Sequence, residues 1–475
     1  MSSLAIVLRV ACEEWRLLLR NRTALGASVL ATALVLTAAL VSHEQRRSLA
    51  QSRAHYQAMV DEQFGAQPDR HPHRMVHYGQ FVFRPLTPLA FFDFGVDAFT
   101  GNTLFLEGHR QNSANFADVR QSSLLLRFGQ LSPAFVLQTL VPLLIIFLAF
   151  ASVSRERESG NLRLLLSQGI SGFQLLLGKG IGHAGIALAV MSPAALALVA
   201  SAATGAARPA AVAAIIFAYA CYLIGWVALG ILVSAWARRG RDALLLLVGI
   251  WIAGVMLVPR TVPGLAQQLH PLPTRLETDI AIHHDMAAIG DSHNPDDPYF
   301  SSFRQQVLQR YNVTRIEDLP VNYSGLVSME GERLTSELFD RYAGQAFAVE
   351  AAQNRWVGRA AWLSPVIALR QLSMRLAGTD GRSHQDFLEQ AERYRYRLIL
   401  DLNRMHAEQV QYEGDKDHRL SHQNWTGLPR FDYRPIDPFR EPAHLLHPLA
   451  VFAGWLLLIS GLLIRRGRQL GRSVR

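Results

Sequence analysis

Three closely spaced histidines are the first candidates for chemistry in this chain of 475 residues. His71, His73 and His77 could offer imidazole nitrogens to a metal ion. Pro72 interrupts a regular helical or strand register between them, and no partner cysteine or acidic cluster is evident nearby. We therefore expect surface histidines here and no metal site.

Nucleotide hydrolysis would need a phosphate-binding loop of the form G-x-x-x-x-G-K-[ST]. The nearest approach has one residue too many between Gly172 and Gly178, and Gly180 follows Lys179 where a magnesium-binding hydroxyl is required. No G-x-S-x-G or H-E-x-x-H motif is visible, and His283 and His284 form no larger constellation. We predict that the chain is not an enzyme, with no catalytic residue and no cofactor.

The elements that position these residues are strongly apolar. The chain is 50% hydrophobic and 18% charged, against roughly 25% charged in soluble proteins. Six runs without any Asp, Glu, Lys or Arg have about the length that crosses a bilayer: residues 23–41, 131–153, 180–203, 211–235, 243–258 and 445–464. They predict six transmembrane helices, the first an anchor because its run is longer than that of a signal peptide.

The net charge of +9 is concentrated beside the ends of these runs. Arginines at 238, 239 and 241 follow the fourth run, and five more lie in the tail 465–475. The positive-inside rule therefore places both termini in the cytoplasm, and the membrane lipid is the expected partner of this charge. A nucleic-acid partner is not expected, because no basic cluster remains for a folded phosphate-binding face.

The segments between the runs complete the predicted fold. Residues 1–22 have the spacing of an amphipathic helix on the cytoplasmic surface. Outside, the segment 42–130 begins with a polar helix to residue 64 and continues with short strands and loops around 77–94. The second outside segment, 259–444, is mostly helical, with helices predicted at 299–311, 331–356, 361–376 and 383–412. Arginines in the helix 361–376 argue against a seventh span and favour an interfacial or domain-core helix.

The fold class is thus an all-α polytopic membrane protein with six transmembrane helices. An extracytoplasmic α+β region, mostly helical, is built from two loops. Two ionisable residues, His183 and His447, lie near the ends of spans, where we expect headgroup contacts. Small residues one turn apart predict close helix packing at two pairs of positions, Gly180 with Ala184 and Gly230 with Ser234.

The predicted cytoplasmic loop 154–179 is the most informative segment. A dense run of Arg and Glu is followed by leucines at helical spacing, and glycines at 169 and 172 prevent another crossing. Such a segment is too apolar to stay in water. It either docks on a protein partner or places its leucines under its own helices.

The residues of this loop resemble a known family. The pattern Glu-Arg-Glu-x-Gly from Glu156 to Gly160, followed by Leu-Arg-Leu-Leu-Leu-Ser-Gln-Gly, is similar to the second membrane exit of type-2 ABC transporter permeases. Stretches at 77–95, 106–112 and 364–395 resemble the branch of these permeases whose extracytoplasmic domain has no known function. Asn161 departs from the family, which usually has Thr there.

The resemblance implies a permease subunit of an ABC transporter, an exporter in the cytoplasmic (inner) membrane of a bacterium. Its partners would be a separate ABC ATPase subunit and a second permease subunit, either a copy of itself or a related paralogue. The loop would form a coupling helix on the ATPase, with the N-terminal helix as a second contact. Carried over by position, the coupling residues are Arg155, Glu156, Arg157, Glu158, Gly160, Leu164 and Leu165. Alternatives without transport remain open: an envelope-complex assembly factor, an extracytoplasmic ligand-binding protein, or a membrane-tethered enzyme in 259–444.

Overall fold

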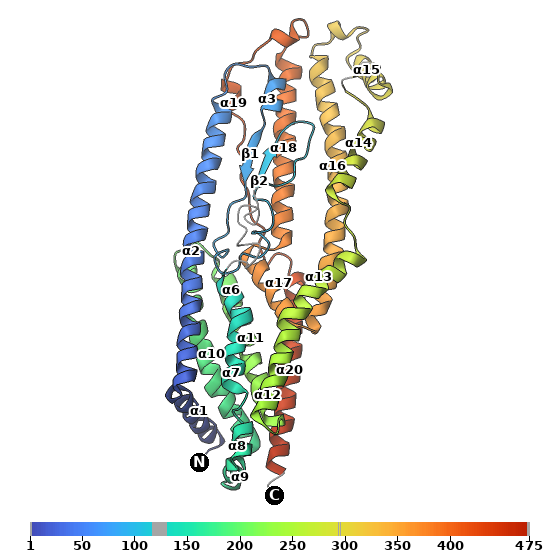
Figure 1. The fold of residues 1–475 in the computed structure, drawn as a ribbon. Helices are drawn as coiled ribbons and strands as arrows, with labels where there is room; N and C mark the ends of the chain where they lie inside the picture. The colour runs from blue at the N-terminus through green and yellow to red at the C-terminus, as the bar shows by residue number, and fades with distance from the viewer. Residues whose placement is uncertain (1, 116–130, 293, 295, 473–475) are drawn as a thin grey trace.

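The chain forms a long, narrow molecule in this computed structural model, which describes residues 2–115, 131–292, 294 and 296–472 (Figure 1). Both ends of the chain lie at the same end of a bundle of long helices, and a second region extends from the opposite end. The part of the predicted segment 42–130 from 116 onward, and the last three residues of the predicted tail, lie outside the described residues.

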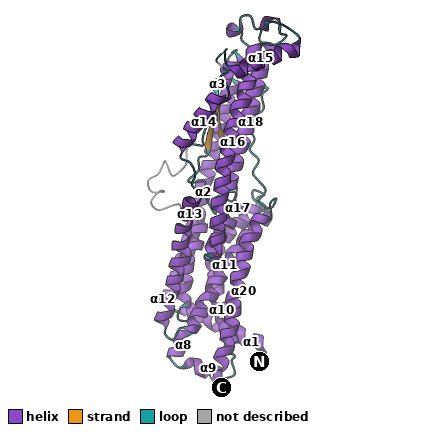
Figure 2. Cartoon of the chain, turned by 90° about the vertical axis from the view of Figure 1, so that its right-hand side faces the viewer, coloured by secondary structure: helices purple, strands orange, loops and turns teal. Residues whose placement is uncertain are grey.

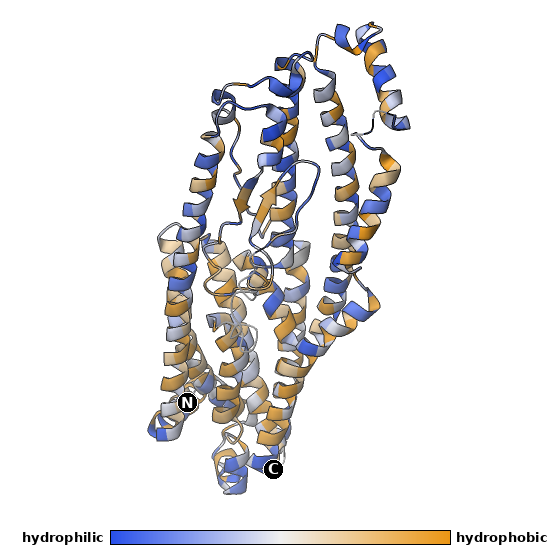
Figure 3. Ribbon diagram, turned by 45° about the horizontal axis from the view of Figure 1, so that its top comes forward, coloured by the Kyte–Doolittle hydropathy of each residue, from blue (hydrophilic) through white to orange (hydrophobic). Residues whose placement is uncertain are grey.

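The terminal face is the end formed by α1 (Ser3–Arg20), α8 (Ser154–Glu158) and α9 (Asn161–Ser167). The distal region is the extension beyond the opposite end of the bundle. Hydrophobic residues gather over the bundle, and hydrophilic residues dominate the distal region and the terminal face (Figure 3).

Six helical stretches of the described residues are long and apolar enough to cross a membrane, which confirms the six predicted spans. They are α2 (Arg22–Gly65); α6, η1, α7 and α8 (Pro133–Phe135, Val136–Leu140, Val141–Ala149, Ser154–Glu158); α10 (Gly172–Ala203); α11 (Pro209–Trp236); α12, η2 and α13 (Gly240–Trp251, Ile252–Leu257, Val258–Leu269); and α20 (Ala443–Arg472). Apolar side chains such as Leu30, Phe217 and Leu245 stay exposed on these helices, as expected of surfaces that face lipid.

The fifth span is longer than its predicted limit at residue 258. Pro259 does not end the helix, because it follows the π-helical turn η2 and stands in the first turn of α13, where a missing backbone donor costs little. The helix therefore continues to Leu269.

The distal region is built on three long helices. The span α2 continues without a break for 44 residues, as predicted for 42–64. The other two long helices, α16 (Tyr323–Arg359) and α18 (Gly381–Gln409), pack against each other (Figure 2), and residues 80–83 and 103–106 lie between α2 and α18 (Figure 1). The elements of this region are α3 (Pro72–Tyr78), β1 (Gln80–Phe83), β2 (Thr103–Leu106), α14 (Arg275–Ile289), α15 (Pro298–Tyr311), η3 (Ile316–Asp318), α16 (Tyr323–Arg359), α18 (Gly381–Gln409), η5 (Asp415–Asp417) and α19 (Gln423–Thr426). Strands β1 and β2 pair antiparallel with Gln80 opposite Leu106, and together with the helices they confirm the α+β prediction. Both strands come from the first predicted outside segment, and α14 to α19 come from the second.

A short buried helix joins the bundle to the distal region. After η4 (Ala360–Trp362), α17 (Pro365–Ala377) packs against α11 and α20 and is too short to be a span. Its Ser373 donates to Asp93 at 2.5 Å and lies 3.0 Å from the Tyr219 hydroxyl of α11. The predicted helix 361–376 is therefore a core helix at this junction.

Candidate functional site

The first helix docks on a row of glycines in α10. A Cβ at Gly178 would lie 2.6 Å from Val10, and one at Gly185 would lie 2.3 Å from the ring of Trp15. Gly182 faces Glu14 in the same way. Only glycine allows this approach, so α1 is fixed against one face of α10.

The pair Gly180 and Ala184, predicted to form such a face, points elsewhere, because a Cβ at Gly180 would meet nothing within 4 Å. The packing face of α10 is offset from that pair. The second predicted pair is used: Gly230 approaches Ala149 and Ser234 contacts the start of α8.

A buried lysine links three elements at the terminal face. Lys179 of α10 is 3% exposed, and its Nζ lies 2.6 Å from Glu14 of α1 and 2.9 Å from Glu156 of α8. The ring of His183, one turn further along α10, contacts the carbonyl oxygens of Lys179 and Leu148. We call Glu14, Lys179 and Glu156 the charge bridge. It joins the two segments that were predicted to contact an ATPase.

His183 is therefore not a headgroup contact. It is 2% exposed, and its Nε2 lies 3.8 Å from Glu14, because α1 covers this part of α10. The charge bridge itself was missed by the sequence reasoning. The available signal was Glu14, an acidic residue on the same helical face as the buried Val7, Ala11 and Leu18.

The start of α8 is held by the end of α11. Ser234 Oγ accepts hydrogen bonds from the backbone amides of Val153 and Ser154 at 3.0 and 3.1 Å. Arg157 donates to the carbonyl oxygens of Ala235 and Ala237, and Arg466 of α20 donates to the first of these. Cations are favourable at a helix C-terminus, where carbonyl groups have no partner in the helix.

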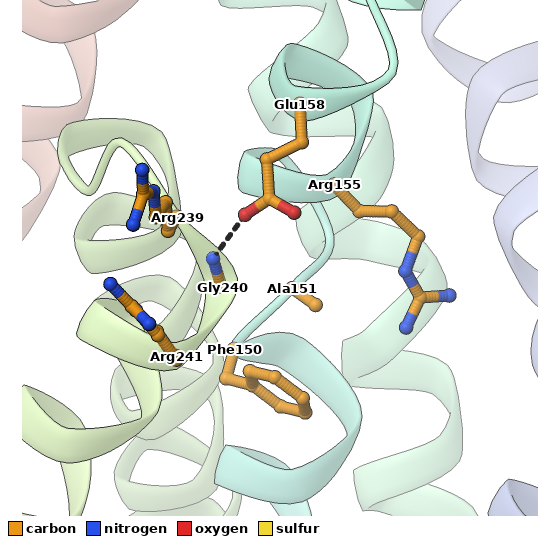
Figure 4. Close-up of a pocket in the computed structure, with 7 residues that line it drawn as sticks. All are labelled: Phe150, Ala151, Arg155, Glu158, Arg239, Gly240 and Arg241. Carbon is orange, nitrogen blue, oxygen red and sulfur yellow. Dashed lines mark hydrogen bonds between the residues drawn. The ribbon is translucent and has the colours of Figure 1, made fainter.

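Glu158 holds α8 against the fifth span. Its Oε1 accepts from the Gly240 amide, at the N-terminus of α12, at 2.6 Å (Figure 4). Beside this bond is a pocket of about 320 Å³ lined by Phe150, Ala151, Arg155, Glu158, Arg239, Gly240 and Arg241. Three guanidinium groups and one carboxylate give it an excess of positive charge, which suits an anionic group.

The leucine-rich helix α9 lies between two glycines in the left-handed conformation, Gly160 (φ 78°) and Gly169 (φ 89°). Leu162 is buried, Leu165 is half-buried, and Leu164 is 58% exposed. Some of its leucines therefore lie under the chain's own helices, as one of the two alternatives predicted, and others face outward. A groove of about 430 Å³ lies between α9 and α1.

The structure sorts the seven predicted coupling residues into two groups. Glu156 and Arg157 are bound within the chain, as described above, and the exposed Glu158 also holds Gly240. The remaining predicted residues are Arg155, Gly160 and Leu164, which are exposed, and Leu165, which is half-buried.

The three sequence-predicted histidines lie in the distal region. Pro72 does not break their register, because it starts α3 and leaves His73 and His77 one turn apart with their Nε2 atoms 3.2 Å from each other. His71 is not a surface residue, since it is 7% exposed and faces His406 and Asp415. Burial lowers the pKa of His73 to about 4. His283 and His284 are exposed, and His447 is half-buried.

Comparison with known proteins identifies the family. The model of the ABC-2 family transporter protein matches residues 8–325, and that of a domain of unknown function (DUF3526) matches residues 275–434. No curated protein matches the chain. The first match includes α1 from residue 8 onward, the α8–α9 segment and the first five spans. The chain therefore belongs to the ABC-2 transporter family and is a membrane-spanning permease subunit of an ABC transporter.

Proposed function

We propose that this permease receives mechanical work from a separate ABC ATPase at the terminal face, which lies in the cytoplasm, and exports its substrate. The observation that carries the proposal is the charge bridge. It links α1 and α8 to α10, so that a force on either predicted contact reaches the spans directly. Membership of the ABC-2 family supports the ATPase as the source of that force.

The exposed surface of the terminal face suits a protein partner. The exposed residues of the α8–α9 segment include the apolar Leu164 and the polar Arg155, Arg163 and Gln168. An apolar centre within a polar rim is the usual composition of a specific interface. The groove between α1 and α9 gives such a partner contacts with both elements at once.

The arginines beside α12 support the cytoplasmic assignment. Arg239 and Arg241 line the pocket of Figure 4 together with Arg155, at the start of the apolar helix α12. Basic residues are enriched at cytoplasmic membrane ends, where anionic lipid headgroups attract them. A second permease subunit, a copy of this chain or a related paralogue, completes the proposed assembly across the exposed faces of α2 and α12.

The membrane orientation is tested by labelling single cysteines. In a Cys12→Ser, Cys221→Ser background, Leu164→Cys and Leu276→Cys place matched exposed thiols at the terminal face and in the distal region. A membrane-impermeant maleimide added to intact spheroplasts should label position 276 alone, and both positions after lysis. Labelling of position 164 in intact spheroplasts would contradict the orientation.

The coupling role is tested with the cognate ATPase. Leu164→Asp should lower both ATPase binding and permease-stimulated ATP hydrolysis, by roughly tenfold or more for an interface residue of central importance. Leu276→Asp is the matched control, since Leu276 is 69% exposed on α14 of the distal region. Equal stimulation by the two variants would refute the assignment of α9 as the ATPase contact.

A further inference from the structure

A cluster of imidazoles and one carboxylate lies in the distal region, far from the charge bridge. His71 stands just before α3, His406 lies in the last turns of α18, and Asp415 begins η5. An antiparallel bridge between Arg70 and Leu420 holds these segments together, although they are far apart in sequence.

The three polar groups converge on one point. Asp415 Oδ1 lies 2.7 Å from His406 Nε2 and 3.4 Å from His71 Nε2. One ligand atom from each of the three residues lies within 4.8 Å of the others. His71 and His406 are 7% and 3% exposed, and the Asp415 side chain is 23% exposed, so the site is enclosed but reachable from solvent.

The hydrogen bonds around this point leave more than one buried imidazole nitrogen without a partner among the described residues, His73 Nδ1 and His406 Nδ1 included. Asn322 donates to Asp415 Oδ1 at 2.7 Å, which orients the carboxylate as outer-shell groups do in metal sites. The second pair, His73 and His77, lies close by, with the His73 ring 6.3 Å from that of His406.

The second pair is joined by a hydrogen bond between the two rings, and the length of that bond also matches the spacing of two metal ligands. Two nitrogens bound to one tetrahedral ion at about 2.05 Å lie about 3.3 Å apart. The His73 and His77 Nε2 atoms are 3.2 Å apart. We propose that this cluster binds a divalent transition-metal ion of the zinc class, with His71, His406 and Asp415 as the ligands and the His73–His77 pair beside them.

The ligand chemistry indicates the class of ion. Two imidazoles and one carboxylate form a frequent ligand set for Zn²⁺, whereas Ca²⁺ and Mg²⁺ prefer a set of oxygens. A fourth position is left for water or for one of the adjacent imidazoles. The bound ion would clamp α3 to the end of α18 and so join the two outside segments.

Metal binding has one structural consequence that can be observed separately. In the structure, His71 Nδ1 accepts a hydrogen bond from the backbone amide of His73 at 3.1 Å and so caps α3. Ligation through Nε2 moves the ring proton to Nδ1, which can then no longer accept. The His73 amide is therefore released, and its hydrogen exchange should accelerate when the metal binds.

The experiment uses the full-length protein without a histidine tag, in nanodiscs, after chelator treatment. Zn²⁺ should bind with at least one equivalent per chain and raise the unfolding temperature, and Co²⁺ should give the strong visible absorption of a tetrahedral site. His406→Gln and Asp415→Asn should each weaken binding by roughly ten- to hundredfold. His283→Gln/His284→Gln, an exposed pair on α14, is the matched control and should bind as the unchanged protein does.

Two outcomes would overturn the proposal. One is binding that stays unchanged in both His406→Gln and Asp415→Asn. The other is binding that is lost only with His73→Gln/His77→Gln, which would remove His71 and Asp415 from the ligand set. The unfolding temperature of each metal-free variant shows whether it has folded, and a variant that fails this control is replaced by Asn322→Ala, expected to weaken Zn²⁺ binding through the orientation of Asp415.

Discussion

Replacing Lys179 with methionine tests whether the charge bridge holds α1 on α10. Methionine keeps most of the volume and removes the cation, which leaves Glu14 and Glu156 without their partner. Removing one member of a buried ion pair costs about 3–5 kcal/mol. Because the Glu156 side chain is 23% exposed and reachable by water, we take the lower limit of about 3 kcal/mol. That free energy corresponds to a roughly 150-fold larger open fraction of α1.

Hydrogen exchange of residues 3–20 in nanodiscs measures this opening. Lys179→Met should accelerate hydrogen exchange at the slowest amides of α1 by roughly 150-fold. Arg16→Met is the matched control, because Arg16 forms an exposed ion pair with Glu13 on the same helix, and such pairs contribute at most a roughly twofold effect.

A second variant separates loss of the bridge from loss of packing. Glu14→Gln/Lys179→Met/Glu156→Gln leaves no buried charge and should regain most of the protection that the single variant loses. The reasoning is refuted if Lys179→Met exchanges no faster than Arg16→Met, or if the triple variant opens as readily as the single one.

Three further predictions concern other parts of the chain. Gly185→Ala should displace Trp15, because the new Cβ would lie 2.3 Å from its ring, and should lower the free energy of unfolding by about 1–3 kcal/mol. A red shift of Trp15 fluorescence checks this displacement, and an unchanged spectrum contradicts it. Gly160→Ala should destabilise the α8–α9 turn by about 1–2 kcal/mol through its φ of 78°, and Gly160→Asn by less; denaturant unfolding measures both. Burial would raise the pKa of Glu332, but His109 and Arg395 lower it to about 2, so its stabilisation is complete above its unfolded pKa and lost as pH falls towards 2. As pH falls towards 2, the unfolding temperature of the unchanged protein should therefore approach that of Glu332→Gln. A difference between the two unfolding temperatures that stays constant over this pH range would contradict the stabilising role of the Glu332 carboxylate.

The six spans could be predicted because each depends on composition alone. A run such as 211–235 without any charge has only one stable environment, and α11 occupies Pro209–Trp236 accordingly. The limit of the fifth span could not be predicted in this way. The effect of Pro259 depends on the π-helical turn before it, and that turn leaves no clear mark in the sequence.

Only part of the candidate site could be predicted, because its remaining contacts depend on tertiary structure. The local pattern indicated that the α8–α9 segment is charged and then leucine-rich, but it did not indicate which of these side chains turn inward. Lys179 meets Glu14 only because Gly178 and Gly182 admit α1, and this contact joins residues 165 positions apart. His71 and His406 are likewise brought together by tertiary structure, so spacing along the chain made the histidines look isolated.

The two ends of the molecule are connected by a single rigid element. Only Asn21 separates α1 from α2, whose 44 residues span about 66 Å. A tilt of about 5° at the terminal face would therefore move its far end by about 6 Å. That far end is Phe64, which packs in one hydrophobic core with Met75 of α3 and Leu402 of α18, beside the histidine cluster. An ion that clamps α3 to α18 would resist such a tilt. Linkage is reciprocal. If the tilt changes the metal affinity by a given factor, metal binding must therefore shift the equilibrium between the tilted and untilted states by the same factor.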